Sequence, residues 1–465
     1  MADREGLRVY AVGGFVRDYF MGNPGNDLDF TIVGDAIGFA EKTARLFKSK
    51  PVVYNRFMTA MVPVGDIKIE FVGTRREEYM PDSRKPIVAE GTLEDDLKRR
   101  DFTINAMAAS ANKSTLGEII DLFGGIADLR DGILRTPLEP EATFSDDPLR
   151  MMRAARFAAR LGFRVEEKCI AAIKKMASRI SIISQERISD EFLKILATEQ
   201  PSSGLNILFE TGLLKFVFPE LHKMAGNNQA EEKGRVYAHK DVLLHSFKVL
   251  DNISKVTDKL WLRFAALVHD IAKPVTKKLI PGSGWSFHGH EDLGAKHMER
   301  IFRRMKLPLD VLGYVERLVR LHQRPMALVD EGVTDSAIRR LAFQAGDALE
   351  DLFVLCRADI TTNNPRLSKK YLDNYERVAA KVIEVQEKDK LREFQSPVRG
   401  EEIMDLCGLA PSPAVGYIKT AIEEAILEGY IPNEYEAAKE YFLKNKEMWL
   451  DEAKQSKNKK NNRKY

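Results

Sequence analysis

Cysteine is scarce in this 465-residue chain, and long apolar runs are missing from it. Cys169, Cys356 and Cys407 are odd in number and widely spaced, which argues against both a disulfide framework and a thiolate metal site. No uninterrupted apolar run approaches the roughly 18 residues needed to span a membrane, and the charged start MADREGLRVY has no signal-peptide core. We therefore expect a soluble protein in a reducing, cytoplasmic setting, without a membrane partner.

Excess charge is also small, because the formal net charge is +3. This balance neither demands nor excludes a nucleic-acid partner, so the local distribution of charge has to decide. The strongly basic run KQSKNKKNNRKY ends the chain without apolar periodicity, and we expect residues 451–465 to be a disordered tail. Such a tail either helps to hold RNA or only keeps the terminus in solution.

Strand-like and helix-like patterns alternate in the first part of the chain. Short β-rich runs such as VYAV, LDFTIV, TAMVPV and IKIEFV accompany a clear helical pattern, DAIGFAEKTARLF. From Pro148 onward strand signals almost vanish, and helical periodicity dominates to about Asn445. We expect an α+β protein in which a small α/β head with a mixed sheet precedes a long all-α body.

Two glycines and two aspartates stand in one strand–helix–strand unit near the N-terminus. Gly13 and Gly14 follow an apolar strand, so a ligand can approach the backbone N–H groups that begin a helix. Asp27 and Asp29 alternate on the next strand, which turns both carboxylates to one side. Because such oxygen ligands suit Mg²⁺ carrying a polyphosphate, the unit predicts a phosphate site facing a metal site.

Glu70 is a candidate third carboxylate in the strand-like run 68–72. It either joins Asp27 and Asp29, where it binds metal or receives the proton of an attacking hydroxyl, or it is an exposed acid on an edge strand.

The run KRRDFTINA follows the predicted metal strands. Its arginines, Arg99 and Arg100, suit a triphosphate, while Asp101, Thr103 and Asn105 offer hydrogen bonds to a ribose and a cap for a following helix. The alternative is a solvated loop with an ordinary N-cap.

A regular series of arginines marks the helix that we expect to begin at Pro148, with Asp147 as its N-cap. The arginines recur at intervals of three and four residues and share one stripe of the helix: Arg150, Arg153, Arg156 and Arg160. A stripe without matching acids fits a surface that receives phosphates or base edges. The alternative is a salt-bridged helix that packs against the head. Asp147 and Arg150 together offer an acceptor and donors to a base edge.

The order of six segments resembles that of the class II tRNA nucleotidyltransferases, the CCA-adding enzymes and their poly(A) polymerase relatives. The segments are GGFVRD, DLDF, RRDFTINA, DLFGGIADL, DDPLRMMRAARFAARLGF and SQERISDEFLKIL, in about the first half of the chain. The resemblance implies that C, C and then A are added from CTP and ATP to the 3′ end of tRNA by two-metal phosphoryl transfer with Mg²⁺. A poly(A) polymerase, or an enzyme adding only CC or only A, is the alternative within this chemistry.

The same resemblance assigns roles to residues. Asp27 and Asp29 would hold the catalytic metals, with Glu70 as the third acidic position. The nucleotide-binding residues would be Gly13, Gly14, Arg17, Asp18, Arg100, Asp101, Asn105, Asp147, Arg150, Arg153 and Arg156. Among these, Asp147 and Arg150 would read the base. The family usually has Glu before this aspartate, whereas this chain has Asp146.

Histidine motifs in the middle of the chain form a second set. The order His245, His269-Asp270, Asp359 resembles that of the HD metal-dependent phosphohydrolases. The resemblance implies that these residues bind a second divalent metal, Mn, Ni, Co or Mg, with His290 as an extra ligand or a phosphate contact. The alternative for each histidine is an ordinary core residue on an apolar helix face.

The motifs together set the expected divisions of the chain. The divisions are a catalytic head at 1–138, a helical neck that binds base and RNA at 139–225, an HD domain at 235–395, an RNA-binding helical part at 396–450 and the tail at 451–465. The HD domain would hydrolyse phosphomonoesters or 2′,3′-cyclic phosphates. Two alternatives come from a different functional class: an HD phosphohydrolase whose head only binds nucleotides, or a non-catalytic RNA-binding protein.

Overall fold

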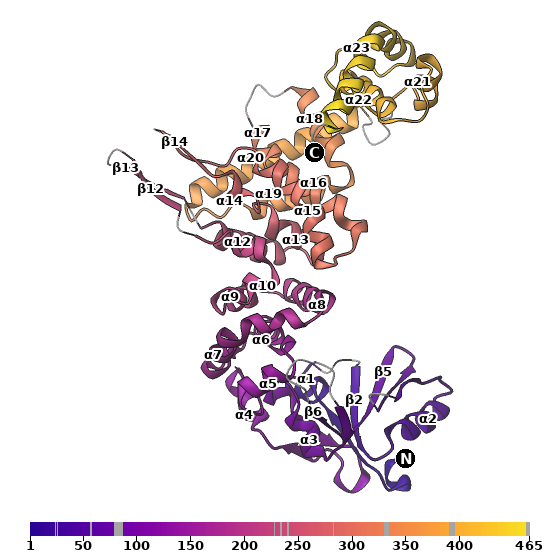
Figure 1. Ribbon diagram of the computed structural model, residues 1–465, viewed down its shortest axis with the longest axis vertical. Coiled ribbons are helices and arrows are strands. Elements are labelled where there is room, and N and C mark those ends of the chain that lie inside the picture. The colour runs from indigo at the N-terminus through magenta and orange to yellow at the C-terminus, as the bar shows by residue number, and fades with distance from the viewer. Residues whose placement is uncertain are drawn as a thin grey trace. The chain divides into compact units, whose positions relative to one another are not determined.

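The computed structural model describes residues 1–23, 25, 27–55, 58–78, 87–226, 228–232, 235–239, 241–281, 283–329, 334–389 and 396–461. The chain divides into two compact units, whose elements are labelled in Figure 1. The first unit consists of Met1–Phe264, Lys278–Ser286 and Glu299–Leu309. The second consists of Ala265–Lys277, Phe287–Met298 and Asp310–Tyr465.

A seven-stranded mixed sheet organises the N-terminal part of the first unit. Its strands are β1 (Arg8–Val12), β2 (Asp27–Val33), β3 (Val52–Tyr54), β4 (Thr59–Val64), β5 (Ile67–Gly73), β8 (Met107–Ser110) and β9 (Ile119–Asp121). They lie in the order β3-β4-β5-β2-β1-β8-β9. β2 and β5 are parallel, whereas β1 pairs antiparallel with both β2 and β8. The expectation of a small head with a mixed sheet is confirmed.

Apolar packing between this sheet and helix α2 (Ala36–Leu46) forms one core of the head. Ile32 from β2 and Phe71 from β5 are buried with Phe39 and Ala40 from α2, and α2 lies beside the sheet in Figure 1. Asp35 caps the helix by accepting a 2.8 Å hydrogen bond from the Gly38 N–H. The pattern DAIGFAEKTARLF therefore forms the helix that it predicts.

The segment after the paired arginines differs from its prediction. Thr103–Asn105 is a single 3-10 turn, and the chain then continues as strand β8 rather than as a helix. β8 lies between β1 and β9, with Met107 and Ala108 fully buried. Sheet pairing and burial decide this segment, and they override the local capping signal.

Helices continue the first unit beyond the sheet. The short elements near the sheet are α1 (Gly14–Phe20), β6 (Arg75–Glu78), β7 (Ile87–Glu90), α3 (Leu93–Lys98) and α4 (Gly125–Asp131). The helices that follow are α5 (Pro140–Asp146), α6 (Leu149–Leu161), α7 (Glu167–Met176), α8 (Gln185–Leu196), α9 (Pro201–Glu210), α10 (Leu214–Val217), α11 (Pro219–His222) and α12 (Val242–Ser254). Short strand pairs also occur, so the body is not purely α: β10 (Ile133–Leu134) with β11 (Arg164–Val165), β12 (Asn228–Glu232) with β13 (Arg235–His239), and β14 (Lys278–Ile280) with β15 (Gly284–Ser286).

Helix α6 begins one residue later than predicted. Pro148 is its N-cap, and Leu149 is its first residue. Asp147 still satisfies the first turn, because its Oδ1 accepts a 3.1 Å hydrogen bond from the Leu149 N–H.

The second unit contains the later helices. They are α14 (Lys273–Thr276), α16 (Leu312–Leu321), α17 (Arg324–Ala327), α18 (Asp335–Ala345), α19 (Leu349–Ala358), α20 (Pro365–Asp389), α21 (Gly400–Cys407), α22 (Pro413–Leu427) and α23 (Tyr435–Asn461). Helices α13 (Leu260–Val268) and α15 (His290–Met305) each have residues in both units. A separate apolar cluster that includes Ile403, Ile418, Phe442 and Trp449 joins α21, α22 and α23.

Helix α23 corrects the expectation of a disordered tail. It continues to Asn461, and residues 462–465 lie outside the described part. Extending an existing helix avoids the cost of nucleation, and Ala, Lys and Gln in this segment have good helix propensity. Among the described residues, no helix has the length and apolarity to cross a membrane.

Candidate functional site

A cavity of about 660 Å³ in the first unit brings together side chains from the head and from α6. It is lined by every residue that the sequence assigns to nucleotide binding: Gly13, Gly14, Arg17, Asp18, Arg100, Asp101, Asn105, Asp147, Arg150, Arg153 and Arg156. Asp29 lines the same cavity. Glu70 is not among the lining residues, and the Asp146 that replaces the family's Glu is not among them either.

The predicted carboxylates lie on neighbouring parallel strands. Asp29 on β2 is the register partner of Glu70 on β5, so both side chains leave the same face of the sheet. Burial and the negative charge of Asp29 raise the pKa of Glu70 above its usual value. β5 is an interior strand, so Glu70 does not lie on a sheet edge, but its side chain is exposed as the alternative expected. The Asp27 backbone pairs with Lys68, and its side chain lies outside the described part.

Gly13 occupies a conformation that side chains rarely adopt, with φ +70° and ψ −135°. A Cβ there would lie 2.8 Å from Arg100 Nη1, so the missing side chain leaves room for that guanidinium. At Gly14 a Cβ would lie 3.4 Å from Arg17 Nη2. The glycine pair therefore gives two arginines close access to the backbone at the start of α1.

Asp101 is the centre of a buried polar network. Its Oδ1 accepts hydrogen bonds from the Phe102 N–H at 2.9 Å and from Asn105 Nδ2 at 3.0 Å. Its Oδ2 accepts from Arg153 Nε at 2.7 Å. Burial by itself raises the pKa of Asp101, but the charge and hydrogen bonds of Arg153, with the Asn105 bond, lower it to about 2.

The network continues into the head through Asn105. Arg17 Nη1 donates a 2.6 Å hydrogen bond to Asn105 Oδ1, and Arg17 Nε donates to Asp18 Oδ1 at 2.8 Å. Arg17 is buried although it is charged, so these partners hold its guanidinium in place.

Arg99 and Arg100 share one buried acid, Asp96 on α3. Arg99 Nε lies 3.0 Å from Asp96 Oδ1, and Arg100 Nη2 lies 3.1 Å from Asp96 Oδ2. Burial by itself raises the pKa of Asp96, yet the two guanidinium groups lower it overall. Because one buried carboxylate orients both arginines, their donors are fixed before any ligand arrives.

The arginine stripe of α6 does have matching acids, contrary to the expectation, and they come from other elements. Arg153 pairs with Asp101, Arg156 Nε donates to Glu191 Oε2 at 2.6 Å, and Arg160 Nη2 lies 3.6 Å from Asp18 Oδ2. The stripe therefore combines both alternatives, since its arginines form ion pairs and also line the cavity.

Asp147 and Arg150 are held by different partners. Arg150 Nη1 donates to the Thr143 carbonyl at 3.2 Å, and Arg150 Nη2 donates to the Arg99 carbonyl. Arg187 Nη2 lies 3.0 Å from Asp147 Oδ2. Sequence reasoning missed Arg187, although its place one turn before Glu191 in SQERISDEF was a signal of a shared helix face.

Phe157 is a second lining residue that sequence reasoning missed. The guanidinium carbons of Arg17, Arg153 and Arg156 lie 5.2, 5.4 and 4.3 Å from its ring centroid. The aromatic face adds a cation–π attraction that gathers the three cations on one wall of the cavity.

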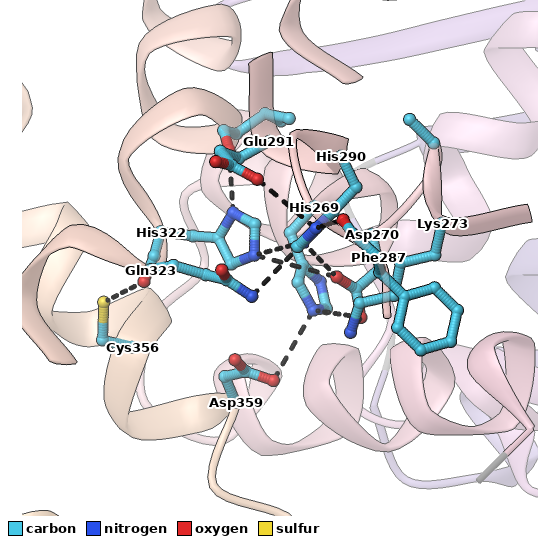
Figure 2. A network of polar contacts seen from close by, with 12 residues as sticks. His269, Asp270, Lys273, Phe287, His290, Glu291, His322, Gln323, Cys356 and Asp359 are labelled. Carbon is cyan, nitrogen blue, oxygen red and sulfur yellow. Dashed lines mark hydrogen bonds and ion pairs between the residues drawn. The ribbon is translucent and has the colours of Figure 1, made fainter. Parts of the chain in front are cut away.

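A buried cluster of histidines surrounds Asp270 in the second unit (Figure 2). His269 Nε2 lies 3.2 Å from Asp270 Oδ2 and 3.5 Å from Asp359 Oδ1. His290 Nε2 and His322 Nε2 lie 3.2 and 3.7 Å from the other carboxylate oxygen, Asp270 Oδ1. The structure thus brings together four predicted residues and one that sequence reasoning missed, His322 at the end of α16.

Each of the three buried imidazoles is oriented by a backbone carbonyl three residues earlier. The Nδ1 atoms of His269, His290 and His322 lie 2.7, 2.8 and 2.7 Å from the carbonyls of Ala266, Phe287 and Val319. Each carbonyl accepts a hydrogen bond from Nδ1–H, so a ring in its neutral form has its lone pair on Nε2, which faces Asp270. Ligand atoms of Asp270, His290 and His322 all lie within 4.8 Å of one another.

The charged neighbours of His269 and Asp270 alter the electrostatics of this cluster. Burial by itself lowers the pKa of His269, but Asp270 and Asp359 raise it to about 10. Lys273 Nζ also lies 2.7 Å from Asp270 Oδ2. His245 lies on α12 in the first unit, so its part in the site stays a prediction.

The fold and the cavity together define a nucleotidyltransferase head joined to a helical body with an HD domain. Family models match in this order: the poly A polymerase head domain at residues 9–135, the probable RNA and SrmB-binding site of polymerase A at 162–224, and the HD domain at 242–364.

The chain belongs to the tRNA nucleotidyltransferase family. It is 33% identical over 367 residues to the multifunctional CCA protein of Methylococcus capsulatus, covering 76% of this chain and 81% of that protein. It is 31% identical over 441 residues to the A-adding tRNA nucleotidyltransferase of Deinococcus radiodurans, covering 92% of this chain and 93% of that one.

Solved structures share the fold. A tRNA nucleotidyltransferase complexed with a primer tRNA and an incoming ATP analog aligns with a TM-score of 0.59 at 24% identity, covering 82% of this chain and 97% of that one. A CCA-adding enzyme in complex with CTP aligns with a TM-score of 0.61 at 22% identity, covering 96% of this chain and 92% of that one.

Proposed function

We propose that this enzyme adds C, C and then A to the 3′ end of tRNA from CTP and ATP, in the cytoplasm. The observation that carries the proposal is the single cavity that gathers the glycine pair, Asp29, the paired arginines and the α6 arginines. The glycine pair and the paired arginines suit a triphosphate, and the α6 arginines suit a base. Membership of the tRNA nucleotidyltransferase family indicates that the reaction is nucleotide transfer.

The proposed reaction is an in-line displacement at phosphorus. The oxygen of the RNA 3′-hydroxyl forms a bond to the α-phosphorus of the NTP, the bond from that phosphorus to the β-bridging oxygen breaks, and pyrophosphate leaves. Glu70, with its raised pKa, is suited to receive the hydroxyl proton. Arg17 and Arg100, each fixed by a hydrogen-bonded partner, would hold the triphosphate.

The carboxylates beside the cavity fit divalent cations. Asp29 and Glu70 face one side of the sheet, and their mutual repulsion is the kind that a bound cation removes. Asp27 and Asp29 would hold Mg²⁺, which when bound lowers the pKa of the attacking hydroxyl and neutralises charge on the leaving pyrophosphate.

Base selection is assigned to Asp147 and Arg150, with Arg153 and Arg156 beside them. These side chains line the cavity, and an enzyme that selects without a nucleic-acid template has only side chains with which to read a base.

The rival specificity is addition of A alone. It is favoured by one observation, since the A-adding relative from Deinococcus radiodurans aligns over 92% of this chain. The test uses tRNA transcripts that end before the first C, after C and after CC, each given CTP, ATP or both. Addition that stops at CCA supports the proposal, whereas A added only to the CC transcript, C alone, or long A tails replace it with an alternative.

A second activity is proposed for the histidine cluster. Asp359, Asp270 and the three buried imidazoles offer the oxygen and nitrogen ligands that suit Mn, Ni, Co or Mg. A metal held there when bound would activate water toward a phosphomonoester or a 2′,3′-cyclic phosphate. The test measures metal content and hydrolysis of both substrates by the purified chain with each metal. The proposal of a second activity is refuted if the purified chain contains no metal and hydrolyses neither substrate with any of the added metals.

A further inference from the structure

One face of helix α8 reaches the residues that are proposed to select the base. Arg187 and Glu191 are four positions apart and so lie on the same face. Arg187 Nη2 lies 3.0 Å from Asp147 Oδ2, and Glu191 Oε2 accepts a 2.6 Å hydrogen bond from Arg156 Nε. The function proposed above gives neither residue of α8 a role.

The Asp147 carboxylate is held at both of its oxygens. Oδ1 accepts a 3.1 Å hydrogen bond from the Leu149 N–H at the start of α6, and Oδ2 meets Arg187. A carboxylate fixed at both ends keeps one orientation, so its remaining lone pairs point in set directions.

Arg150, the other proposed base reader, is not available to fix that carboxylate. Its guanidinium donates to the carbonyls of Thr143 and Arg99, and only 8% of the residue is exposed. The side chain of Arg187, in contrast, is 44% exposed and lines the cavity. Arg187 is therefore the guanidinium that meets Asp147 at the cavity wall.

Glu191 keeps α8 in register with α6. Its residue is 3% exposed, and beyond Arg156 its Oε1 lies 3.9 Å from Arg153 Nη1. Moving α8 would leave this buried carboxylate away from its cations, which is costly. The backbone that carries Arg187 is thus anchored one helical turn away from Asp147.

We propose that Arg187 is a positioning residue for nucleotide selection, which holds the Asp147 carboxylate where it accepts from the amino group of cytosine or adenine. Uracil and guanine present a carbonyl oxygen at the corresponding edge, and a fixed carboxylate repels it. Without Arg187 the carboxylate turns more freely, and the penalty against the wrong base falls. This inference rests on the proposed function, because it assigns selection to Asp147.

The test compares full-length wild type with Arg187→Ala, Arg187→Lys and Lys175→Ala. Incorporation kinetics with CTP, ATP, UTP and GTP give kcat/KM for each nucleotide, and titrations give each Kd. In Arg187→Ala we expect the preference for CTP over UTP and for ATP over GTP to fall by about tenfold, the size of one good base contact. Arg187→Lys keeps the charge and should restore part of that preference. Lys175 forms an exposed pair with Glu141 at 2.9 Å, so its alanine variant should match wild type.

Several outcomes overturn the proposal. Preference ratios in Arg187→Ala equal to those of wild type refute it, and so does an equal loss for all four nucleotides together with a lower Tm, since that marks a purely structural role. Binding titrations separate this result from the fate of the proposed function. If wild type binds CTP and ATP selectively but transfers neither to RNA, the proposed function fails while the Kd ratios still decide the role of Arg187. If wild type shows no selectivity in binding or in transfer, both fail.

Discussion

Asp101 shows how much of the nucleotide site is fixed by a single residue. Its two oxygens accept from Phe102, Asn105 and Arg153, and its carboxylate is buried. The network depends on the charge of that carboxylate, because protonation removes the ion pair between Oδ2 and the Arg153 guanidinium.

Asp101→Asn should therefore lower the free energy of unfolding by about 2 kcal/mol, less than the 3–5 kcal/mol of a fully buried pair, because the Arg153 side chain is 33% exposed. Urea unfolding measures the change. Asp131→Asn, which removes an exposed pair with Arg130, is the control, and no measurable change is expected there because solvent screens that pair.

The same residue predicts a dependence on pH. The folded pKa of Asp101 is lowered to about 2, whereas an unfolded aspartate has a pKa of about 4. Its stabilising contribution is thus complete above about pH 4 and is lost as the pH falls toward 2. The stability difference between wild type and Asp101→Asn should shrink over this window, and a difference independent of pH would contradict the assignment.

Glu70 carries a prediction about activity. The pKa of its carboxyl is raised by burial and by Asp29, so protonation starts at a higher pH than for an ordinary glutamate. As the pH is lowered, nucleotide incorporation by wild type should therefore begin to decline at a pH above the ordinary pKa of glutamate. Glu70→Gln should lower kcat by roughly 10²-fold or more and abolish this acid limb. A pH–rate profile for both proteins checks it, and an unchanged acid limb in Glu70→Gln would exclude the role.

The proposed nucleotide-binding residues line one cavity, but their sequence patterns did not predict which partners hold their side chains. The pairing of Asp29 with Glu70, and the meeting of Asp101 with Arg153, depend on strand register and helix placement. His322 was missed because it stands alone in its local pattern, whereas Arg187 shares a helix face with Glu191 but has no local sign of its partner Asp147. Only the fold brings them to Asp147 and Asp270.

Among the elements, the start of α1 requires glycine for two reasons at once. Gly13 has a backbone conformation outside the range of other residues, and a Cβ there would meet Arg100 at 2.8 Å. Gly13→Ala should therefore cost roughly 1–3 kcal/mol of backbone strain and displace Arg100 from the cavity.

The measurable result at Gly13→Ala is a higher KM for the nucleotide, by about tenfold or more if one charge-assisted contact is lost. Gly22→Ala is the matched control, since Gly22 also has a positive φ of +72° but meets nothing within 4 Å. An equal KM for both variants would show that strain alone, and not the displacement of Arg100, governs the effect.

Elements with a clear hydrophobic periodicity were predictable from the sequence. Elements whose conformation depends on pairing with neighbouring strands were not. The alternation in LDFTIV and the cap of α2 are local signals, and both gave the observed element. β8 is a strand because β1 and β9 flank it, and the sequence MAAS alone does not say so. The α6 arginines were placed on the right stripe, but their acids lie on α8 and in the head.

For the whole molecule, the two candidate sites lie in different compact units. Asp29→Ala should abolish nucleotide incorporation and leave any phosphohydrolase activity intact, because Asp29 contributes only to the first unit. His269→Ala should have the reverse effect, since its ring faces Asp270 and Asp359. Both assays on both variants make the test, and loss of both activities in either variant would contradict independent sites.

The overall architecture was the most predictable property. The switch from β-rich to helical patterning near Pro148 corresponds to the change from the sheet to the helical body. The division at 138 was drawn from the same change in pattern, and side-chain contacts such as Asp101 with Arg153 cross it. Sequence patterns predict helices and strands well, but they do not show which side chains of the head contact side chains of the helical body.

The continuous chain of contacts from Arg17 through Asn105, Asp101 and Arg153 to Glu191 has a practical consequence for protein engineering. Heads exchanged between relatives at residue 138 would separate charged groups that belong to one network. A graft that keeps residues 1–196 together carries the network whole. The natural unit of exchange for this chain is therefore the head with helices α5 to α8, and not the sheet-bearing segment alone.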